Sequence, residues 1–89
     1  MITVEFFSGE PPCSSCVELI KLADEFEQKY AGKIRVVKHI GTAGAARFRE
    51  LGLECVPAIV INGSIRIEGI CPSRRLLENA LTEMGQWRG

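Results

Sequence analysis

The chain has 89 residues, a length typical of one small domain, so we treat residues 1–89 as a single domain. Hydrophobic residues make up 46% of the chain and charged residues 25%, which excludes a disordered protein and allows a core that folds without metal or disulfides. The 11 basic and 11 acidic side chains cancel, so nucleic acids and anionic membranes are not expected as partners.

The first part of the chain predicts a strand, a helix and a second strand. Residues 2–7 (ITVEFF) are rich in β-forming residues, and the SGEPP that follows has the glycine and prolines of a loop. Residues 16–30 place apolar side chains at helical spacing, with charged side chains on the opposite face. Gly32 suits the end of this helix. Residues 33–40 (KIRVVKHI) then predict a second strand, with His39 on the surface and without a partner.

The second part predicts a short helix, a hairpin and a last helix. Residues 42–52 (TAGAARFRELG) place apolar side chains at helical intervals, and Gly44 weakens this helix. The Asn-Gly pair at 62–63 suits a type I′ turn and separates two β-rich runs within residues 56–69. Residues 71–84 predict a last helix with Ser73 as its N-cap. Its apolar stripe consists of Leu77, Ala80, Leu81 and Met84.

The predicted order of elements is therefore β-α-β-α-β-β-α. A right-handed crossover makes the first two strands parallel, and the hairpin adds an antiparallel pair. The sequence thus predicts an α/β fold in which a four-stranded mixed sheet is flanked by helices on both faces.

The location of the protein decides how its four cysteines are interpreted. No segment approaches the roughly 20 apolar residues of a membrane span, and the opening MITVEFF does not resemble an export signal. We therefore expect a cytoplasmic protein with no membrane partner. In a reducing compartment the cysteines are expected to be reactive or metal-binding rather than a disulfide scaffold.

Cys13 and Cys16 are separated by two serines at the predicted junction of strand and helix. Side chains three residues apart on a helix lie about 5 to 6 Å apart at Cβ, and a small adjustment brings them to disulfide distance. The positive end of the helix dipole favours a thiolate on Cys13, whereas Cys16 faces the apolar side and is expected to be less exposed and less ionised. The pattern predicts that Cys13 attacks a target disulfide and Cys16 resolves the mixed disulfide, without a cofactor.

The CSSC motif, followed later by FRELGLECVPAIVINGSIRIEG, resembles the thioredoxin and glutaredoxin superfamily, and particularly its short, glutaredoxin-sized members. The likeness covers nearly the whole chain and includes a helix ending in Gly52, a Val56-Pro57 step and an Asn-Gly hairpin. In that superfamily the proline is cis and lies against the cysteines, while the residue before it pairs through its backbone with an extended substrate. The resemblance implies these roles for Pro57 and Val56, with protein disulfides as substrates.

The chain departs from both branches of the superfamily. Thioredoxins have Trp before the first cysteine and Gly-Pro between the two, where this chain has Pro12 and Ser14-Ser15. They also carry a buried acidic residue; Glu5 is the only acidic residue on the first strand, and a solvent-facing position is open to it. The stretches that hold glutathione in glutaredoxins read GEPP and EGICPSRR here, so a protein dithiol reductase is the expected electron donor rather than glutathione. We expect a monomer.

Other interpretations of the cysteines stay open. The Cys13-Cys16 pair is also compatible with a static disulfide, with ordinary thiols, or with a metal or iron-sulfur site of the same fold. Cys55 and Cys71 form no second C-x-x-C, so a tetrathiolate site is not expected. On the superfamily geometry Cys55 lies at the rim of the active site. Each of these two cysteines is an ordinary thiol, an accessory reactive thiol, or the partner of the other across a loop.

Overall fold

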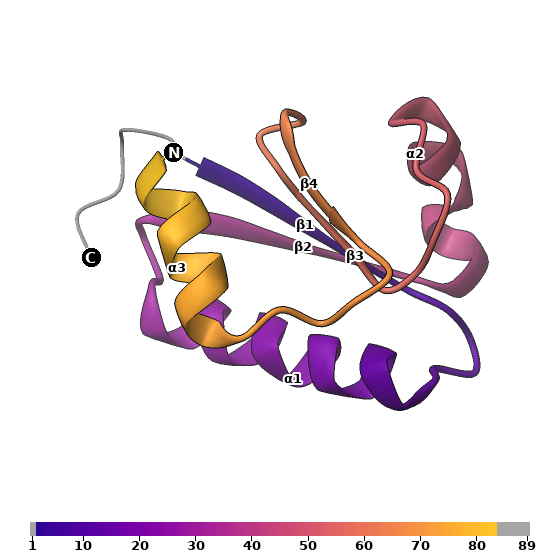
Figure 1. The fold of residues 1–89 in the computed structure, drawn as a ribbon, viewed down its shortest axis with the longest axis horizontal. Helices are drawn as coiled ribbons and strands as arrows, with labels where there is room; N and C mark the ends of the chain where they lie inside the picture. The colour runs from indigo at the N-terminus through magenta and orange to yellow at the C-terminus, as the bar shows by residue number, and fades with distance from the viewer. Residues whose placement is uncertain (1, 84–89) are drawn as a thin grey trace.

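The computed structural model describes residues 2–83, and its elements follow the predicted order (Figure 1). They are, in chain order, β1 (Ile2–Ser8), α1 (Ser14–Lys29), β2 (Ile34–Ile40), α2 (Ala45–Glu50), β3 (Ala58–Ile61), β4 (Ile65–Glu68) and α3 (Arg74–Glu83). Met84, which we expected to extend the last apolar stripe, lies outside the described residues. Within residues 2–83, none of the helices combines the length and the apolar character that crossing a membrane requires.

The four strands form one mixed sheet in the order β2-β1-β3-β4. Strand β1 runs parallel to β2 and antiparallel to β3, and β3 pairs antiparallel with β4. Between β3 and β4, Asn62 and Gly63 have φ values of 50° and 72°, the left-handed conformation that a type I′ turn requires. Asn62 also exchanges two hydrogen bonds of 2.8 Å with the backbone of Thr3. The predicted mixed sheet and its hairpin are confirmed.

One face of the sheet is covered by α1 and α3, which bury the larger core. Because side chains of a strand alternate between faces, every second residue of β1 enters this core. The helices contribute apolar residues at the predicted helical spacing, and Figure 1 shows α1 running along this side of the sheet. The fully buried side chains of this cluster include Val4, Leu19, Phe26, Ile59, Leu77 and Leu81.

The opposite face is covered by α2 and has a smaller core. Phe7, Ala58 and Val60 are buried there, and Phe48 of α2 packs against them. Glu5 points to the same face and is only 6% exposed, so the solvent-facing position considered for it is wrong. A central strand buried on both faces leaves no solvent-facing position for this side chain.

Glu5 is buried together with two partners. Arg47 donates hydrogen bonds from Nε and Nη2 to the two carboxylate oxygens of Glu5, at 2.9 and 3.0 Å. Nε2 of His39 lies 3.0 Å from Glu5 Oε1. The Arg47 hydrogen bonds, which outweigh burial, hold the pKa of the Glu5 carboxyl below its usual range, and His39 acts in the same direction. The expectation that His39 has no partner is therefore wrong.

The helix predicted for residues 42–52 is shorter than expected. A 3₁₀ turn, Gly41–Gly44, follows β2, and the α-helical turns of α2 begin only at Ala45. Gly44 packs directly on β2, where a Cβ atom would lie 2.4 Å from Cβ of His39. Since only glycine permits this approach, the chain turns tightly at Gly44 before α2 begins.

Candidate active site

Cys13 and Cys16 lie at the start of α1, after the loop that follows β1. Cys13 is the N-cap of α1, and its Sγ accepts the backbone N–H of Cys16 at 3.4 Å. The sulfur thereby satisfies one of the backbone donors that a helix leaves unpaired at its start. The two Sγ atoms are 3.3 Å apart and joined by a hydrogen bond, so the thiols can form a disulfide with little movement.

The two thiols differ in exposure. Cys13 is exposed, whereas Cys16 is 1% exposed because it points to the apolar side of α1. A disulfide on another protein can therefore reach Cys13 but cannot reach Cys16. This asymmetry is what a pair of attacking and resolving thiols requires.

The ionisation of Cys16 differs from the expectation. Burial of Cys16 opposes its charged form, but hydrogen bonds from the Gly9 backbone, from Cys13 and from the Ser8 side chain outweigh burial and lower the Cys16 pKa. Burial therefore does not make Cys16 the poorly ionised thiol that we expected. The two sulfurs are hydrogen-bonded to each other, and of the two only Cys13 is exposed.

Val56 and Pro57, the residues before β3, are the segment to which the resemblance assigned substrate binding, and we call them the substrate ledge. The Val56-Pro57 peptide is cis, as the resemblance implied, and the buried Pro57 accepts the N–H of Gly69 at 2.9 Å. Val56 is 42% exposed, and its backbone makes no hydrogen bond with residues 2–83. A Cβ atom on Gly9, which contacts Cys16 through its backbone, would lie 3.7 Å from Cγ2 of Val56. The side chain of Val56 thus lies beside Gly9, in the loop that leads from β1 to Cys13.

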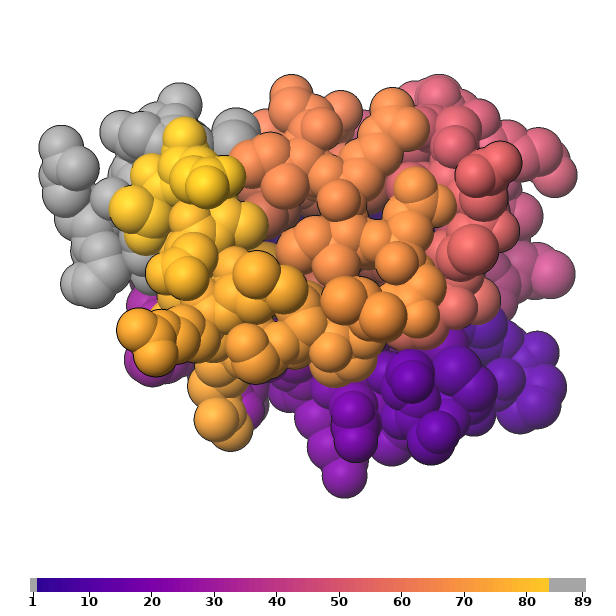
Figure 2. All heavy atoms as spheres, in the orientation of Figure 1, coloured from indigo at the N-terminus to yellow at the C-terminus, as the bar shows by residue number. Residues whose placement is uncertain are grey.

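Cys55 and Cys71 are free thiols at the margin of this region. Cys55 is exposed and precedes the ledge, and its Cβ would lie 3.9 Å from a Cβ atom on Gly69. Cys71 is half-buried, and burial, together with the charge of Glu18, raises the pKa of its thiol. Figure 2 shows the segment after β4, which contains Cys71, against the start of α1. A raised pKa makes Cys71 a poor nucleophile.

Metal-binding groups are sparse in the part of the chain that the structure describes. Residues 2–83 contain no group of three or more His, Cys, Asp or Glu side chains placed to hold a metal ion. A metal at this site would therefore have Cys13 and Cys16 as its protein ligands, with neither Cys55 nor Cys71 beside them. Two thiolates are fewer ligands than a structural zinc site uses.

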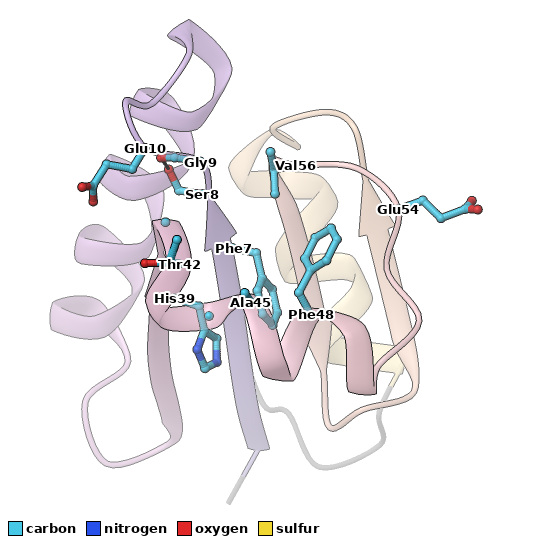
Figure 3. Close-up of a pocket in the computed structure, with 12 residues that line it drawn as sticks. Phe7, Ser8, Gly9, Glu10, His39, Thr42, Ala45, Phe48, Glu54 and Val56 are labelled. Carbon is cyan, nitrogen blue, oxygen red and sulfur yellow. Dashed lines mark hydrogen bonds between the residues drawn. The ribbon is translucent and has the colours of Figure 1, made fainter.

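A cavity of about 540 Å³ opens between the end of β1, the 3₁₀ turn and α2 (Figure 3). Its walls include the rings of Phe7, His39 and Phe48, and the backbone of Ser8 and Gly9. The amino-acid sequence alone did not indicate this cavity, because its walls come from segments that are far apart in the chain. The one local signal was Gly44, whose lack of a side chain keeps the turn close to β2.

Comparison with known proteins agrees with this geometry. The sequence matches the thioredoxin domain family over residues 2–82. A probable thioredoxin of Methanothermobacter thermautotrophicus is 35% identical over 83 residues, which are 93% of this chain and 95% of that protein. A probable thioredoxin of Methanothermobacter marburgensis is 32% identical with the same coverage.

Solved structures show the same fold at lower sequence identity. A thioredoxin-like protein from Clostridium perfringens superposes with a TM-score of 0.78 at 19% identity, covering 100% of this chain and 75% of that one. Chloroplastic thioredoxin z superposes with a TM-score of 0.73 at 21% identity, covering 96% of this chain and 80% of that one. On the family match and the two relatives, the chain belongs to the thioredoxin family of thiol oxidoreductases.

Proposed function

We propose that the chain exchanges disulfides with protein substrates, with Cys13 as the attacking thiol and Cys16 as the resolving thiol. The observation that carries this proposal is a pair of sulfurs 3.3 Å apart of which only one is exposed. The N–H of Cys16, which already points at Cys13 Sγ, stabilises negative charge on the sulfur that attacks.

The reaction proceeds in two exchanges. In the first, the Cys13 thiolate bonds to one sulfur of the substrate disulfide, and the other substrate sulfur leaves as a thiolate that takes a proton from water. In the second, the Cys16 thiolate bonds to Cys13 Sγ and the remaining substrate sulfur leaves. The substrate gains two electrons and two protons, and the chain ends as a Cys13–Cys16 disulfide.

The substrate ledge supports binding of an extended peptide. The unpaired backbone of Val56 offers the hydrogen bonds of one more strand position, and the buried Pro57 follows it in the chain. Because these hydrogen bonds are made by main chain, the ledge accepts many sequences. The favoured substrate is therefore a protein disulfide in an exposed, extended segment.

The oxidised chain must be reduced again after each cycle. We propose a protein dithiol reductase as the donor rather than glutathione, since the usual glutathione-holding residues are replaced by EGICPSRR. One chain contains both thiols and the ledge, so a monomer suffices. A cytoplasmic location fits a dithiol that starts each cycle reduced.

The proposal is tested by reduction of a protein disulfide with dithiothreitol as electron source. Cys13→Ser should abolish activity, and Cys16→Ser should accumulate a mixed disulfide through Cys13 that mass spectrometry identifies. The control variants Cys55→Ser and Cys71→Ser should keep the activity. Retained activity in Cys13→Ser would contradict the proposal, and stoichiometric zinc, copper or iron on the purified chain would favour the metal-binding alternative.

A further inference from the structure

The cavity shares one wall with the dithiol. Ser8 and Gly9, at the end of β1, line the cavity, and the same two residues lower the pKa of Cys16. Val56 of the substrate ledge forms part of the rim. Side chains of an extended peptide alternate in direction, so a peptide paired along Val56 would direct a side chain near its reacting cysteine toward the cavity.

The interior of the cavity is aromatic. The ring of Phe7 stacks on His39 with centroids 4.5 Å apart and meets the edge of Phe48 at 5.9 Å. Figure 3 shows the Phe7, His39 and Phe48 rings grouped between the 3₁₀ turn and α2. Aromatic faces pack well against the aliphatic stems of long side chains and also attract cations.

The rim of the cavity is acidic. Glu10 and Glu54 are both exposed and stand at opposite ends of the cavity, with their carboxylates directed outward (Figure 3). Neither carboxylate forms an ion pair with any of residues 2–83. Among residues 2–83, no Lys or Arg lines the cavity; His39, which does, is paired with Glu5, and the nearby Arg47 is held by Glu5 and Glu50. The two unpaired carboxylates therefore give the entrance a negative potential.

We propose that this cavity binds a lysine or arginine side chain of the protein substrate, close to the reacting cysteine. The aliphatic stem lies against the aromatic wall at Phe48, and the charged group stays at the rim, where the field of the Glu10 and Glu54 carboxylates favours a cation. A phosphate or another anion is disfavoured, because it would meet two carboxylates and no cation. This inference rests on the proposed function and names the substrate preference of the same site.

The first experiment compares disulfide-bonded peptides that differ only at one position beside the cysteine, occupied by Arg, Gln, Leu or Glu. The Arg peptide should have a KM roughly fivefold below that of the Gln peptide at low ionic strength. The Glu peptide should have the highest KM of the four. In about 0.5 M salt the preference for Arg should largely disappear, because the carboxylates are exposed.

Two double variants test which carboxylates are responsible. In E10Q/E54Q the ratio of the KM values for the Gln and Arg peptides should fall to about 1, because the rim is neutral. The matched control E27Q/E83Q removes two exposed charges of α1 and α3 and should keep the preference. Three results would each overturn the inference. They are equal KM values for the Arg and Gln peptides in the wild type, a preference for Arg that persists in E10Q/E54Q, and a lower KM for the Leu peptide than for the Arg peptide.

A binding measurement separates this inference from the proposed function. Peptides with serine in place of cysteine are titrated into the reduced chain, and amide chemical shifts are followed by NMR. The Arg peptide should shift the amides of Phe7, Gly9 and Gly44 at lower concentration than the Gln peptide. If the chain binds the Arg peptide selectively but reduces no disulfide, only the proposed function is contradicted. If it reduces disulfides but does not bind the Arg peptide selectively, only the cavity inference is contradicted.

Discussion

The two faces of the sheet are built on different principles although β1 serves both. The face under α1 and α3 is an apolar core in which Leu19, Phe26 and Leu77 are fully buried. The face under α2 has a buried carboxylate, its partners and an open cavity. Apolar burial supplies most of the free energy of folding, whereas buried polar groups are retained where they position something else. The face under α1 and α3 therefore holds the fold and carries the dithiol at the start of α1, whereas the face under α2 adds the cavity.

The largest expected effect is on the apolar face. Phe26→Ala should lower the free energy of unfolding by about 4 kcal/mol, because it leaves a cavity among well-packed side chains. Phe48→Ala, the matched change on the α2 face, should cost about 1 kcal/mol, since Phe48 is only partly buried and borders an existing cavity. Urea unfolding with unchanged m-values checks both. Equal losses would remove the distinction between the faces.

The next effect tests the buried carboxylate of the α2 face. Glu5→Gln should lower the free energy of unfolding by about 2 kcal/mol, because it weakens charge-assisted hydrogen bonds that are largely shielded from water. The control Glu50→Gln removes the other carboxylate bonded to Arg47. Because the Glu50 side chain is 66% exposed, this change should lower the free energy of unfolding by less than about 0.5 kcal/mol. If Glu50→Gln lowered the free energy of unfolding as much as Glu5→Gln does, burial of the Glu5 carboxylate would not strengthen its interaction with Arg47.

The loss of stability at acid pH should also depend on Glu5. The folded state lowers the Glu5 pKa below its ordinary value of 4.5, so the stability from Glu5 is present above that value and is lost as pH falls through the lower, folded-state pKa. Glu5→Gln lacks this titration, and its stability should converge with that of the wild type as pH falls below 4.5. Urea midpoints measured across this pH range check the prediction. A constant difference between the two proteins would exclude Glu5 as the titrating group.

The smallest effect is expected at the surface of the apolar face. Arg74 of α3 pairs with Glu25 of α1, but the Arg74 side chain is 64% exposed. Because exposed ion pairs contribute little, Arg74→Gln should leave the urea midpoint within experimental error, in low salt and in high salt alike. A loss comparable to that of Glu5→Gln would mean that surface charges also hold α3 on the sheet.

Local sequence signals predicted much of this molecule. The strand and helix order, the Asn62-Gly63 turn and the placement of Cys13 at a helix start all depend on residues close together in the chain. The α2 face could not be predicted in the same way. Glu5 and Arg47 are 42 positions apart, and nothing near Glu5 in sequence indicates that a distant arginine would allow its burial.

The same limit applies to the site. The dithiol follows from a four-residue motif, whereas the cavity requires β1, β2, the 3₁₀ turn and the ledge to be brought together. The unexpected ionisation of Cys16 has a similar origin, because it depends on Ser8 and Gly9, which the sheet places behind the thiol. Motifs therefore predicted the reacting atoms, and tertiary contacts determined their surroundings.

Cys13 serves both as the cap of α1 and as the proposed attacking atom, so each catalytic cycle would alter the start of that helix. A sulfur in a disulfide carries less negative charge than a thiolate and accepts the N–H of Cys16 more weakly. The first turn of α1 should therefore fray more easily when the pair is oxidised. Amide hydrogen exchange at this turn would then report the redox state of the protein from its backbone alone.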